Sequence, residues 1–369
     1  MFDAQFSNGK EGKNVSEKVL MKGNEAIGEA AIRSGCRHFF GYPITPQTEL
    51  SAYMAKKMPK IGGVFLQAES EISAINMVYG AAGAGARVMT SSSSPGISLK
   101  SEGISYIAGA DLPCVIVDIV RGGPGLGGIQ PAQSDYFQAT KGGGHGDYHM
   151  VVLAPNSVQE IVKLTADAFN LADTYRTPVM ILGDGTLGQM MEPVDFDDVP
   201  APVQADKSWA TDGTGLEREH NIINSLYLSP EELEETVLRR QKKYDVILEK
   251  EVRYEAHDLE DAEIVIVSYG TTSRIVESAV KTLRKNGVKA GVIRPITLWP
   301  FPADIIAKAA QGAKAVLSVE MSMGQMVEDV KIAVNGKAPV YFYGRTGGII
   351  PTPGEVIAEV EKIMGGVLA

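Results

Sequence analysis

The segment around residues 113–120 constrains the fold most, because it contains four consecutive apolar residues, Cys114-Val115-Ile116-Val117. A strand with one face in water alternates apolar and polar residues, whereas a strand of a parallel sheet is covered on both faces and can be apolar throughout. Helix-period segments, the clearest at residues 157–175, separate this run from further β-rich runs at residues 37–41, 63–67, 87–90, 150–153 and 178–183. The pattern predicts a doubly wound α/β domain with a parallel sheet.

A second α/β unit is predicted in the C-terminal part of the chain. Its strands are expected at residues 262–269, 288–295, 314–320 and 339–343, and its helices at 271–286, 303–310 and 354–364. Residues 192–205 are rich in Asp, Pro and Val and indicate an extended linker. We predict an N-terminal tail (1–20), a first domain (21–190), a linker with a charged helix (191–258) and a second domain (259–369).

The charged helix of the linker has a clear start. Ser229-Pro230-Glu231-Glu232 places Pro in the first turn and acids at the positive end of the helix dipole. The helix is expected to reach about residue 252 and carries Arg239, Arg240, Lys242 and Lys243. We interpret it as a mostly solvated face or a packing arm.

Composition excludes several classes of protein. The 369 residues are 44% hydrophobic and 22% charged, as in a globular protein, and the net charge of −10 argues against a nucleic-acid partner. No apolar stretch is long enough to span a bilayer, and residues 1–19 lack the apolar core of an export signal, so a cytoplasmic location is predicted. Cys36 and Cys114 lie among apolar residues without C-x-x-C spacing, which favours buried free thiols over a metal or cluster site.

A stiff loop follows the first predicted strand. In Gly41-Tyr42-Pro43-Ile44-Thr45-Pro46, each Pro fixes its own φ and keeps the residue before it extended, which restricts Tyr42 and Thr45. Ligands of open α/β sheets bind where such loops leave the carboxyl ends of strands. The alternative interpretation is an ordinary rigid loop between a strand and a helix.

Two charged residues also lie at predicted strand ends. Glu71 heads a helix of small residues that is expected to be deeply buried. Its carboxylate is either a helix cap stabilised by the dipole or a catalytic proton carrier with a raised pKa. Arg121 ends the most apolar strand, where its guanidinium either pairs with a structural acid or binds a ligand carboxylate through two hydrogen bonds.

Three glycine-rich motifs give weaker signals. Gly123–Gly128 satisfies G-x-G-x-x-G after a strand, but no amphipathic helix follows it, which favours a mobile active-site loop over a dinucleotide site. Gly183-Asp184-Gly185 resembles the start of the magnesium-diphosphate motif of thiamine enzymes, yet the Asn pair expected about two dozen residues later is missing, so we exclude a metal site. The Gly142–Asp147 loop, with His145 and nearby His149, is expected to face a substrate or partner.

Together these residues resemble the alpha subunit of the 2-oxoacid:ferredoxin oxidoreductases. The resemblance lies in five segments: Gly41–Pro46, Glu69–Glu71, Thr90–Gly96, Leu112–Pro124 and Arg294–Pro302. The last segment is similar to the transketolase C-terminal-type domain of these enzymes. The branched-chain (3-methyl-2-oxobutanoate) type is the most similar, through Arg121–Pro131 and Gly142–Asp147.

The resemblance implies a thiamine diphosphate enzyme that converts a 2-oxoacid, coenzyme A and oxidised ferredoxin into an acyl-CoA, carbon dioxide and reduced ferredoxin. The first domain would bind the aminopyrimidine half of the cofactor, and a separate beta subunit would bind the diphosphate and Mg²⁺. Gamma-type and small ferredoxin-like subunits are implied as further partners, and any 4Fe-4S clusters would lie on partner subunits. The chain would be active only with these partners.

The resemblance also implies roles for single residues. Glu71 would hydrogen-bond N1′ of the aminopyrimidine and favour the imino tautomer that deprotonates the thiazolium C2. Arg121 would hold the substrate carboxylate, and Thr45 would donate a hydrogen bond to that carboxylate or to the keto oxygen. Tyr42, Pro43 and Ile44 would contribute to the cofactor site.

The substrate and some alternatives stay open. A 2-oxoglutarate enzyme would need a second cation, and Leu126–Ala132 carries no charge, which favours an apolar substrate side chain. Arg345 is either a surface or interface arginine or, if its loop reaches the site, a partner for a distal carboxylate. The competing functions are a non-catalytic ligand-binding or scaffold subunit and a free-standing nucleotide-dependent dehydrogenase.

Overall fold

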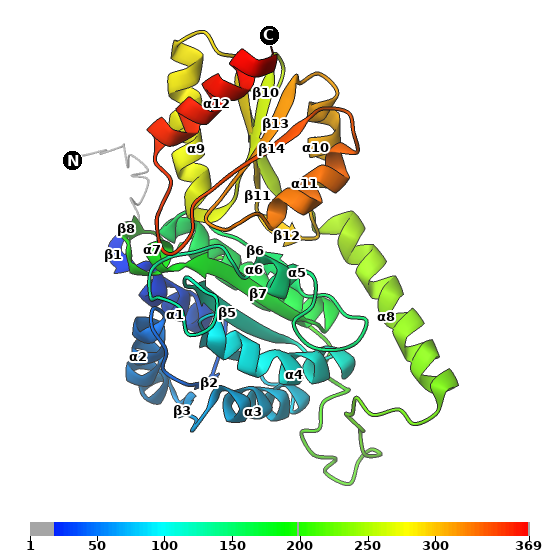
Figure 1. The fold of residues 1–369 in the computed structure, drawn as a ribbon. Coiled ribbons are helices and arrows are strands. Elements are labelled where there is room, and N and C mark those ends of the chain that lie inside the picture. The colour runs from blue at the N-terminus through cyan, green and yellow to red at the C-terminus, as the bar shows by residue number, and fades with distance from the viewer. Residues whose placement is uncertain (1–17, 198, 368–369) are drawn as a thin grey trace, which may run out of the picture.

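A seven-stranded sheet organises the first part of the chain (Figure 1). The computed structural model describes residues 18–197 and 199–367. Every neighbouring pair in the sheet is parallel except β12 with β6. The strand order is β12 (Thr297–Trp299), β6 (Val151–Leu153), β7 (Pro178–Asp184), β5 (Cys114–Val120), β4 (Val88–Ser92), β2 (His38–Gly41) and β3 (Val64–Gln67).

Helices cover both faces of this sheet, as the apolar strands predict. One helical layer contains α1 (Gly23–Arg33), which packs on α2 (Thr48–Lys57) and α6 (Val158–Tyr175). The other contains α3 (Glu71–Gly83) packed on α4 (Pro95–Gly109) (Figure 1). All seven residues of β5 are consequently buried, which confirms the doubly wound class. The remaining short helices are η1 (Met58–Ile61), α5 (Tyr136–Thr140) and α7 (Gly185–Gln189).

The second α/β unit contains a five-stranded sheet. Its strand order is β14 (Val340–Gly344), β13 (Ala315–Glu320), β10 (Ile264–Val267), β11 (Ala290–Pro295) and β9 (Tyr254–His257), and only β9 runs antiparallel. Its helices are α9 (Gly270–Lys285), α10 (Ala303–Ala310), α11 (Met326–Val334) and α12 (Pro353–Val367). The predicted strands and helices of this unit are all present, whereas β9, β12 and α11 were not predicted.

The charged helix α8 (Pro230–Lys250) is a packing arm. The Ser229 side chain caps it by accepting a hydrogen bond from the Glu232 N–H at 3.3 Å. One stripe of the helix, Thr236, Arg240, Tyr244 and Ile247, is buried, while most of its other residues are exposed. Tyr244 joins His149 and Trp299 in an aromatic cluster, so the arm packs against both halves of the chain.

Part of the predicted linker is not extended coil. Its first residues form β8 (Met191–Val194), which pairs antiparallel with β1 (Val19–Lys22) in a separate two-stranded sheet. The predicted tail, residues 1–20, lies outside the described residues except for residues 18–20. The domain limits themselves stay predictions.

The described ranges contain no helix whose length and apolar content would let it cross a bilayer. Cys36 and Cys114 are buried free thiols, as predicted, and burial raises the pKa of each to about 12.

Candidate active site at the carboxyl edge of the first sheet

The sheet topology brings the predicted site residues to one edge. Strands β3, β2, β4 and β5 are consecutive neighbours and run parallel, so their carboxyl ends lie side by side. Thr45 follows β2, Glu71 follows β3, and Arg121 follows β5. Helix α4 starts at Pro95 after β4, and β4 lies between β3, which precedes Glu71, and β5, which precedes Arg121.

The Tyr42–Pro46 loop is fixed by two amide side chains. Gln47 donates from its side chain to the Tyr42 carbonyl at 3.2 Å and accepts a hydrogen bond from Ser91 Oγ at 2.7 Å. Asn24 donates to the Pro46 carbonyl at 2.8 Å. Thr45 and Pro43 are exposed at this edge, so the loop is a rigid support that presents the Thr45 hydroxyl outward.

Arg121 is held by two backbone carbonyls, and its Nε–H has no acceptor among the described residues. Its Nη1 donates to the Thr45 carbonyl at 3.1 Å and its Nη2 donates to the Leu126 carbonyl at 2.9 Å. Its Nε is buried and has no acceptor within the described residues, although the side chain is only 7% exposed. Neither acceptor is a structural acid, which leaves the charge available for an anionic ligand.

Glu71 is the first residue of α3 and is 5% exposed. The capping interpretation is wrong in one respect, because the side chain that caps the helix is that of Ser70, which accepts the Ser73 N–H at 3.2 Å. The Glu71 carboxylate accepts no hydrogen bond from any residue that the structure describes. It lies over Gly96, where an added Cβ would be 2.6 Å from Glu71 Oε1 and 2.0 Å from Ser92 Oγ.

Helix α3 is less buried than its small residues suggested. Ile72, Asn76 and Gly80 are exposed along its outer face, and Ile72 has half of its surface in contact with solvent. The expectation of a deeply buried helix is therefore wrong for the chain alone, since only one side of α3 packs on the sheet and on α4.

Sequence reasoning missed Lys100, a buried cation next to the site. Its Nζ donates to Thr90 Oγ1 at 2.8 Å and to the Ser91 carbonyl at 2.9 Å. Burial lowers the pKa of Lys100 to about 7, against the opposing influence of Glu71 and Asp118. No spacing signal identifies Lys100, because a lysine in a helix is normally solvated.

The glycine-rich motifs have different outcomes. No helix begins directly after Gly123–Gly128, and the Arg121–Gln130 region folds back on itself through a 2.8 Å hydrogen bond from Gly128 N–H to the Gly122 carbonyl. Asp184 is buried and caps α7 by accepting the N–H groups of Thr186 and Leu187.

His149 and Arg345 have partners inside the chain. His149 was expected to face a substrate or partner, but its ring stacks on Trp299 with 4.6 Å between centroids. Arg345 forms an ion pair with Glu355. The loop that carries it does reach the site, since an added Cβ on Gly122 would lie 3.6 Å from Gly348 N.

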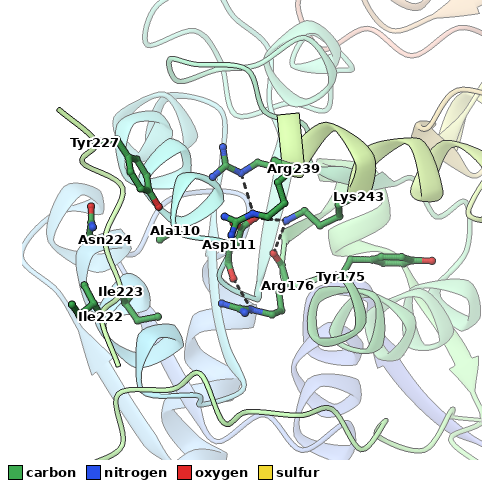
Figure 2. Close-up of a pocket in the computed structure, with 11 residues that line it drawn as sticks. Ala110, Asp111, Tyr175, Arg176, Ile222, Ile223, Asn224, Tyr227, Arg239 and Lys243 are labelled. Carbon is green, nitrogen blue, oxygen red and sulfur yellow. Dashed lines mark hydrogen bonds and ion pairs between the residues drawn. The ribbon is translucent and has the colours of Figure 1, made fainter. Parts of the chain in front are cut away.

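A separate basic cavity lies away from this edge (Figure 2). It has a volume of about 390 Å³, and Asp111, which precedes β5, lies in its wall. Arg239, Arg240 and Lys243 of α8 form ion pairs with Asp111. The cavity is thus at the amino end of β5, whereas Arg121 is at the carboxyl end.

The carboxyl edge fits the aminopyrimidine half of thiamine diphosphate. Besides Glu71, the hydroxyl groups of Ser92 and Ser93 are buried without partners in the described ranges, as is Arg121 Nε. Buried polar groups are normally satisfied, so their concentration at one edge indicates a polar ligand. Within residues 18–197 and 199–367, no group of three His, Cys, Asp or Glu side chains is placed to hold a metal ion.

Comparisons with known proteins agree on a family. A family model described as "Pyruvate flavodoxin/ferredoxin oxidoreductase, thiamine diP-bdg" matches residues 29–269, and one described as "Pyruvate:ferredoxin oxidoreductase core domain II" matches residues 262–356. The ketoisovalerate oxidoreductase subunit VorB of Methanothermobacter marburgensis is 52% identical, over 94% of this chain and 98% of that protein. The 2-oxoglutarate synthase subunit KorA of the same organism is 39% identical, over 95% of this chain and 100% of that protein.

Solved structures give the same result. The 2-oxoglutarate:ferredoxin oxidoreductase from Magnetococcus marinus, with 2-oxoglutarate, coenzyme A and succinyl-CoA bound, has a TM-score of 0.81 and 29% identity, covering 98% of this chain and 68% of that one. A split-gene transketolase, an inactive beta4 tetramer, has a TM-score of 0.58 and 16% identity, covering 93% of this chain and 97% of that one. At this identity the similarity supports the fold alone. The chain belongs to the family of thiamine diphosphate-dependent 2-oxoacid:ferredoxin oxidoreductase subunits.

Proposed function

We propose that the chain is the alpha subunit of an oxidoreductase for branched-chain 2-oxoacids. The observation that carries the proposal is the combination of Arg121, whose Nε has no acceptor among the described residues, with apolar residues nearby in the chain. Leu126, whose carbonyl contacts Arg121, and Ile129 in the same loop are 82% and 57% exposed. If a partner subunit covers this loop, a second substrate carboxylate would be buried against these side chains, which is costly without a paired charge.

The proposed roles are those that the family resemblance implies, and the geometry supports them. Thiamine diphosphate supplies the carbanion stabilisation that decarboxylation of a 2-oxoacid requires. Glu71 holds a proton at N1′ of the aminopyrimidine, and a carboxylate without a hydrogen-bond donor among the described residues suits that task. Arg121 binds the substrate carboxylate through Nε and the outer edge of its guanidinium, and Thr45 donates to the carboxylate or the keto oxygen. Tyr42, Pro43 and Ile44 support the cofactor from the same loop.

A partner subunit completes this site in our proposal. The edge strand β3, which leads into the loop before Glu71, and the start of α3 expose Val64, Leu66 and Ile72 to 43%, 39% and 50%. Exposed apolar side chains beside a half-open polar site mark a protein interface. The relatives are named as subunits, and we assign this face to the beta subunit that binds diphosphate and Mg²⁺. Gamma-type and ferredoxin-like subunits with 4Fe-4S clusters, coenzyme A, ferredoxin and a cytoplasmic location stay predictions.

The second candidate is a 2-oxoglutarate enzyme. Relatives of 36% to 39% identity are named 2-oxoglutarate synthase subunits. The Arg345 loop touches Gly122, so a distal carboxylate that displaced Glu355 from Arg345 would gain a cation near the site. This exchange breaks an existing ion pair, which is why we rank the branched-chain substrate first.

The experiment is an assay of the native complex with coenzyme A and a low-potential dye acceptor. A panel of 3-methyl-2-oxobutanoate, pyruvate and 2-oxoglutarate is compared by kcat/KM. We expect the branched acid to exceed 2-oxoglutarate by about 100-fold or more, because an unpaired carboxylate costs several kcal/mol. A preference for 2-oxoglutarate would overturn the proposed substrate, and a complex inactive on every 2-oxoacid would support a scaffold role.

Calorimetry of the isolated chain with NAD(P) tests the dehydrogenase alternative, for which tight binding is required.

A further inference from the structure

Two carboxyl groups meet in the interior behind Arg121. Asp118, on β5, is fully buried, and Asp135 precedes α5 and is half-buried. The Oδ2 atom of each has no donor among the described residues and almost no exposed surface. Both lie next to Ser94: Asp118 accepts the Ser94 N–H, and Asp135 lines the same cavity as Ser94. Burial, and after it the neighbouring Asp135, raises the pKa of Asp118. An ionised carboxylate only accepts hydrogen bonds, so one proton held between the two groups would give both Oδ2 atoms a partner.

We propose that Asp118 and Asp135 share one proton and, as a singly charged pair, position Ser94 and through it the backbone of Arg121. The link to the substrate rests on the function proposed above for Arg121. The shared proton itself is independent of that function.

The hydrogen bonds from the pair to Arg121 are short and direct. Asp118 Oδ1 accepts the backbone N–H of Ser94 at 3.1 Å. The Ser94 hydroxyl accepts the N–H of Arg121 at 3.1 Å and donates to the Arg121 carbonyl at 3.3 Å. Asp135 lines the same cavity as Ser94. Ser94 thus connects Asp118 to the residue whose guanidinium is offered to the substrate.

Ser94 needs this support because its backbone is strained. Its φ of +24° lies in a region that L-residues rarely adopt. Strained residues persist only where their surroundings hold them, and they concentrate at functional sites. The strained turn lets Ser94 face β5 while Pro95 and Gly96 begin α4 beneath Glu71.

Electrostatics favour the singly charged state. Burial raises the pKa of Asp118 well above its ordinary value, and the neighbouring Asp135 raises it further. Burial also raises the pKa of Asp135. The opposing cation is Lys100 from α4, and Tyr269 faces both acids from the second α/β unit. Since Lys100 is itself shared with Glu71, it does not neutralise a second negative charge.

The first test is direct and uses no substrate. Infrared spectra of the intact complex at neutral pH are compared for wild type, Asp118→Asn, Asp135→Asn and the exposed control Asp304→Asn. We expect both pair variants to lose one protonated-carboxyl C=O band that wild type and the control retain. If neither variant loses such a band, the pair does not hold a proton and the proposal is wrong.

The second test measures the positioning role. In Asp135→Asn, the amide donates permanently to Asp118, so kcat/KM should stay within about threefold while the alkaline loss of activity caused by the second ionisation disappears. In Asp118→Ala, Ser94 loses its acceptor, so KM for the 2-oxoacid should rise about tenfold or more with a smaller change in kcat.

Asp118→Asn keeps an acceptor for Ser94 and provides the conservative rescue if the Ala variant does not fold. An unchanged KM in a folded Asp118→Ala complex, or an unchanged alkaline limb in Asp135→Asn, would overturn the positioning role. A failure of Arg121 to bind the substrate would leave the infrared result intact, so the two proposals fail separately.

Discussion

Glu71 differs from the other carboxylates near the site in what surrounds it. It is nearly buried, yet it has no hydrogen-bond donor in the part of the chain that the structure describes, whereas Asp118 accepts one from Ser94. A carboxylate in this condition costs free energy unless a ligand supplies the donor. The protonated N1′ of the aminopyrimidine would provide the missing donor.

Glu71→Gln should therefore abolish most of the turnover without unfolding the chain. The amide is isosteric but cannot exchange a proton with N1′, and loss of a proton-transfer group typically costs about 10²–10⁴ in rate. The measurement is kcat of the reconstituted complex. Glu69→Gln, two residues earlier on an exposed side chain, is the matched control and should keep full activity. Full turnover of Glu71→Gln would remove the catalytic assignment.

The positions of site residues were easier to predict than their partners. Thr45, Glu71 and Arg121 each end a predicted parallel strand, and parallel strands bring their carboxyl ends to one edge, so their proximity follows from the pattern. Lys100 and Asp118 gave no such signal, because a lysine in a helix and an acid in a strand look like surface residues until the packing is known.

At the scale of elements, the approach of α3 to α4 depends on glycines of α4, and Gly96 is the one that faces Glu71. Gly96 lies at the start of α4, where a Cβ would meet Ser92 Oγ at 2.0 Å and Glu71 Oε1 at 2.6 Å. Contacts this short cannot be relieved without moving the Glu71 carboxylate, and a displacement of about 1 Å can cost about 10² in rate.

Gly96→Ala is accordingly expected to lose about 100-fold or more in kcat, with a folded chain. The control is Gly354→Ala at the start of α12, where an added Cβ would have no atom within 4 Å. Activity comparable to wild type in Gly96→Ala would mean that Glu71 has another position in the working enzyme.

Helix α8 is held to the first sheet by Asp111 (Figure 2). Lys243 Nζ lies 2.6 Å and Arg240 Nε 3.3 Å from the same Asp111 oxygen. Burial alone would raise the pKa of Asp111, but Lys243 and Arg240 outweigh burial and lower it. A lowered pKa means that the ion pairs stabilise the fold above the ordinary Asp range and that this contribution is lost as the pH falls through the folded-state pKa.

Asp111→Asn should reduce the free energy of unfolding by about 2 kcal/mol, because three cations then lose their carboxylate. Urea unfolding at neutral pH measures this change, and the difference from wild type should shrink as the pH falls below 4. Asp212→Asn, which removes an ion pair whose acid is 62% exposed, should cost less than about 1 kcal/mol. Equal effects of the two variants would contradict the anchoring role of Asp111.

Local patterns predicted the elements that complete βα units but not those that pair at long range. Helix α8 begins where Ser229 and Pro230 indicated. Strand β12, by contrast, leaves the second unit to pair with β6, and β1 pairs with β8 across most of the first domain. Strands this short carry little periodicity of their own, and the partners of β1, β8 and β12 are fixed only by the tertiary packing.

At the scale of the whole molecule, the surface around the edge strand β3 and the first turn of α3 is the feature that most needs a partner. Val64, Leu66 and Ile72 are exposed apolar residues of these two elements, and together we call them the apolar patch. An edge strand with exposed apolar residues is prone to associate with another chain. The proposed site is open on this side, so the chain that covers the patch would also close the site.

Ile72→Lys should therefore break the complex while the chain itself stays folded. Burying an unpaired ammonium in an apolar interface costs several kcal/mol, enough to weaken association by about 10² or more. Size measurement with light scattering, after mixing with the beta subunit, should show separate chains, and the circular dichroism of the variant alone should match wild type. Ile332→Lys, at a 73% exposed position on α11 in the second unit, is the control. An intact, active complex with Ile72→Lys would place the beta subunit on another face and would contradict the proposed interface.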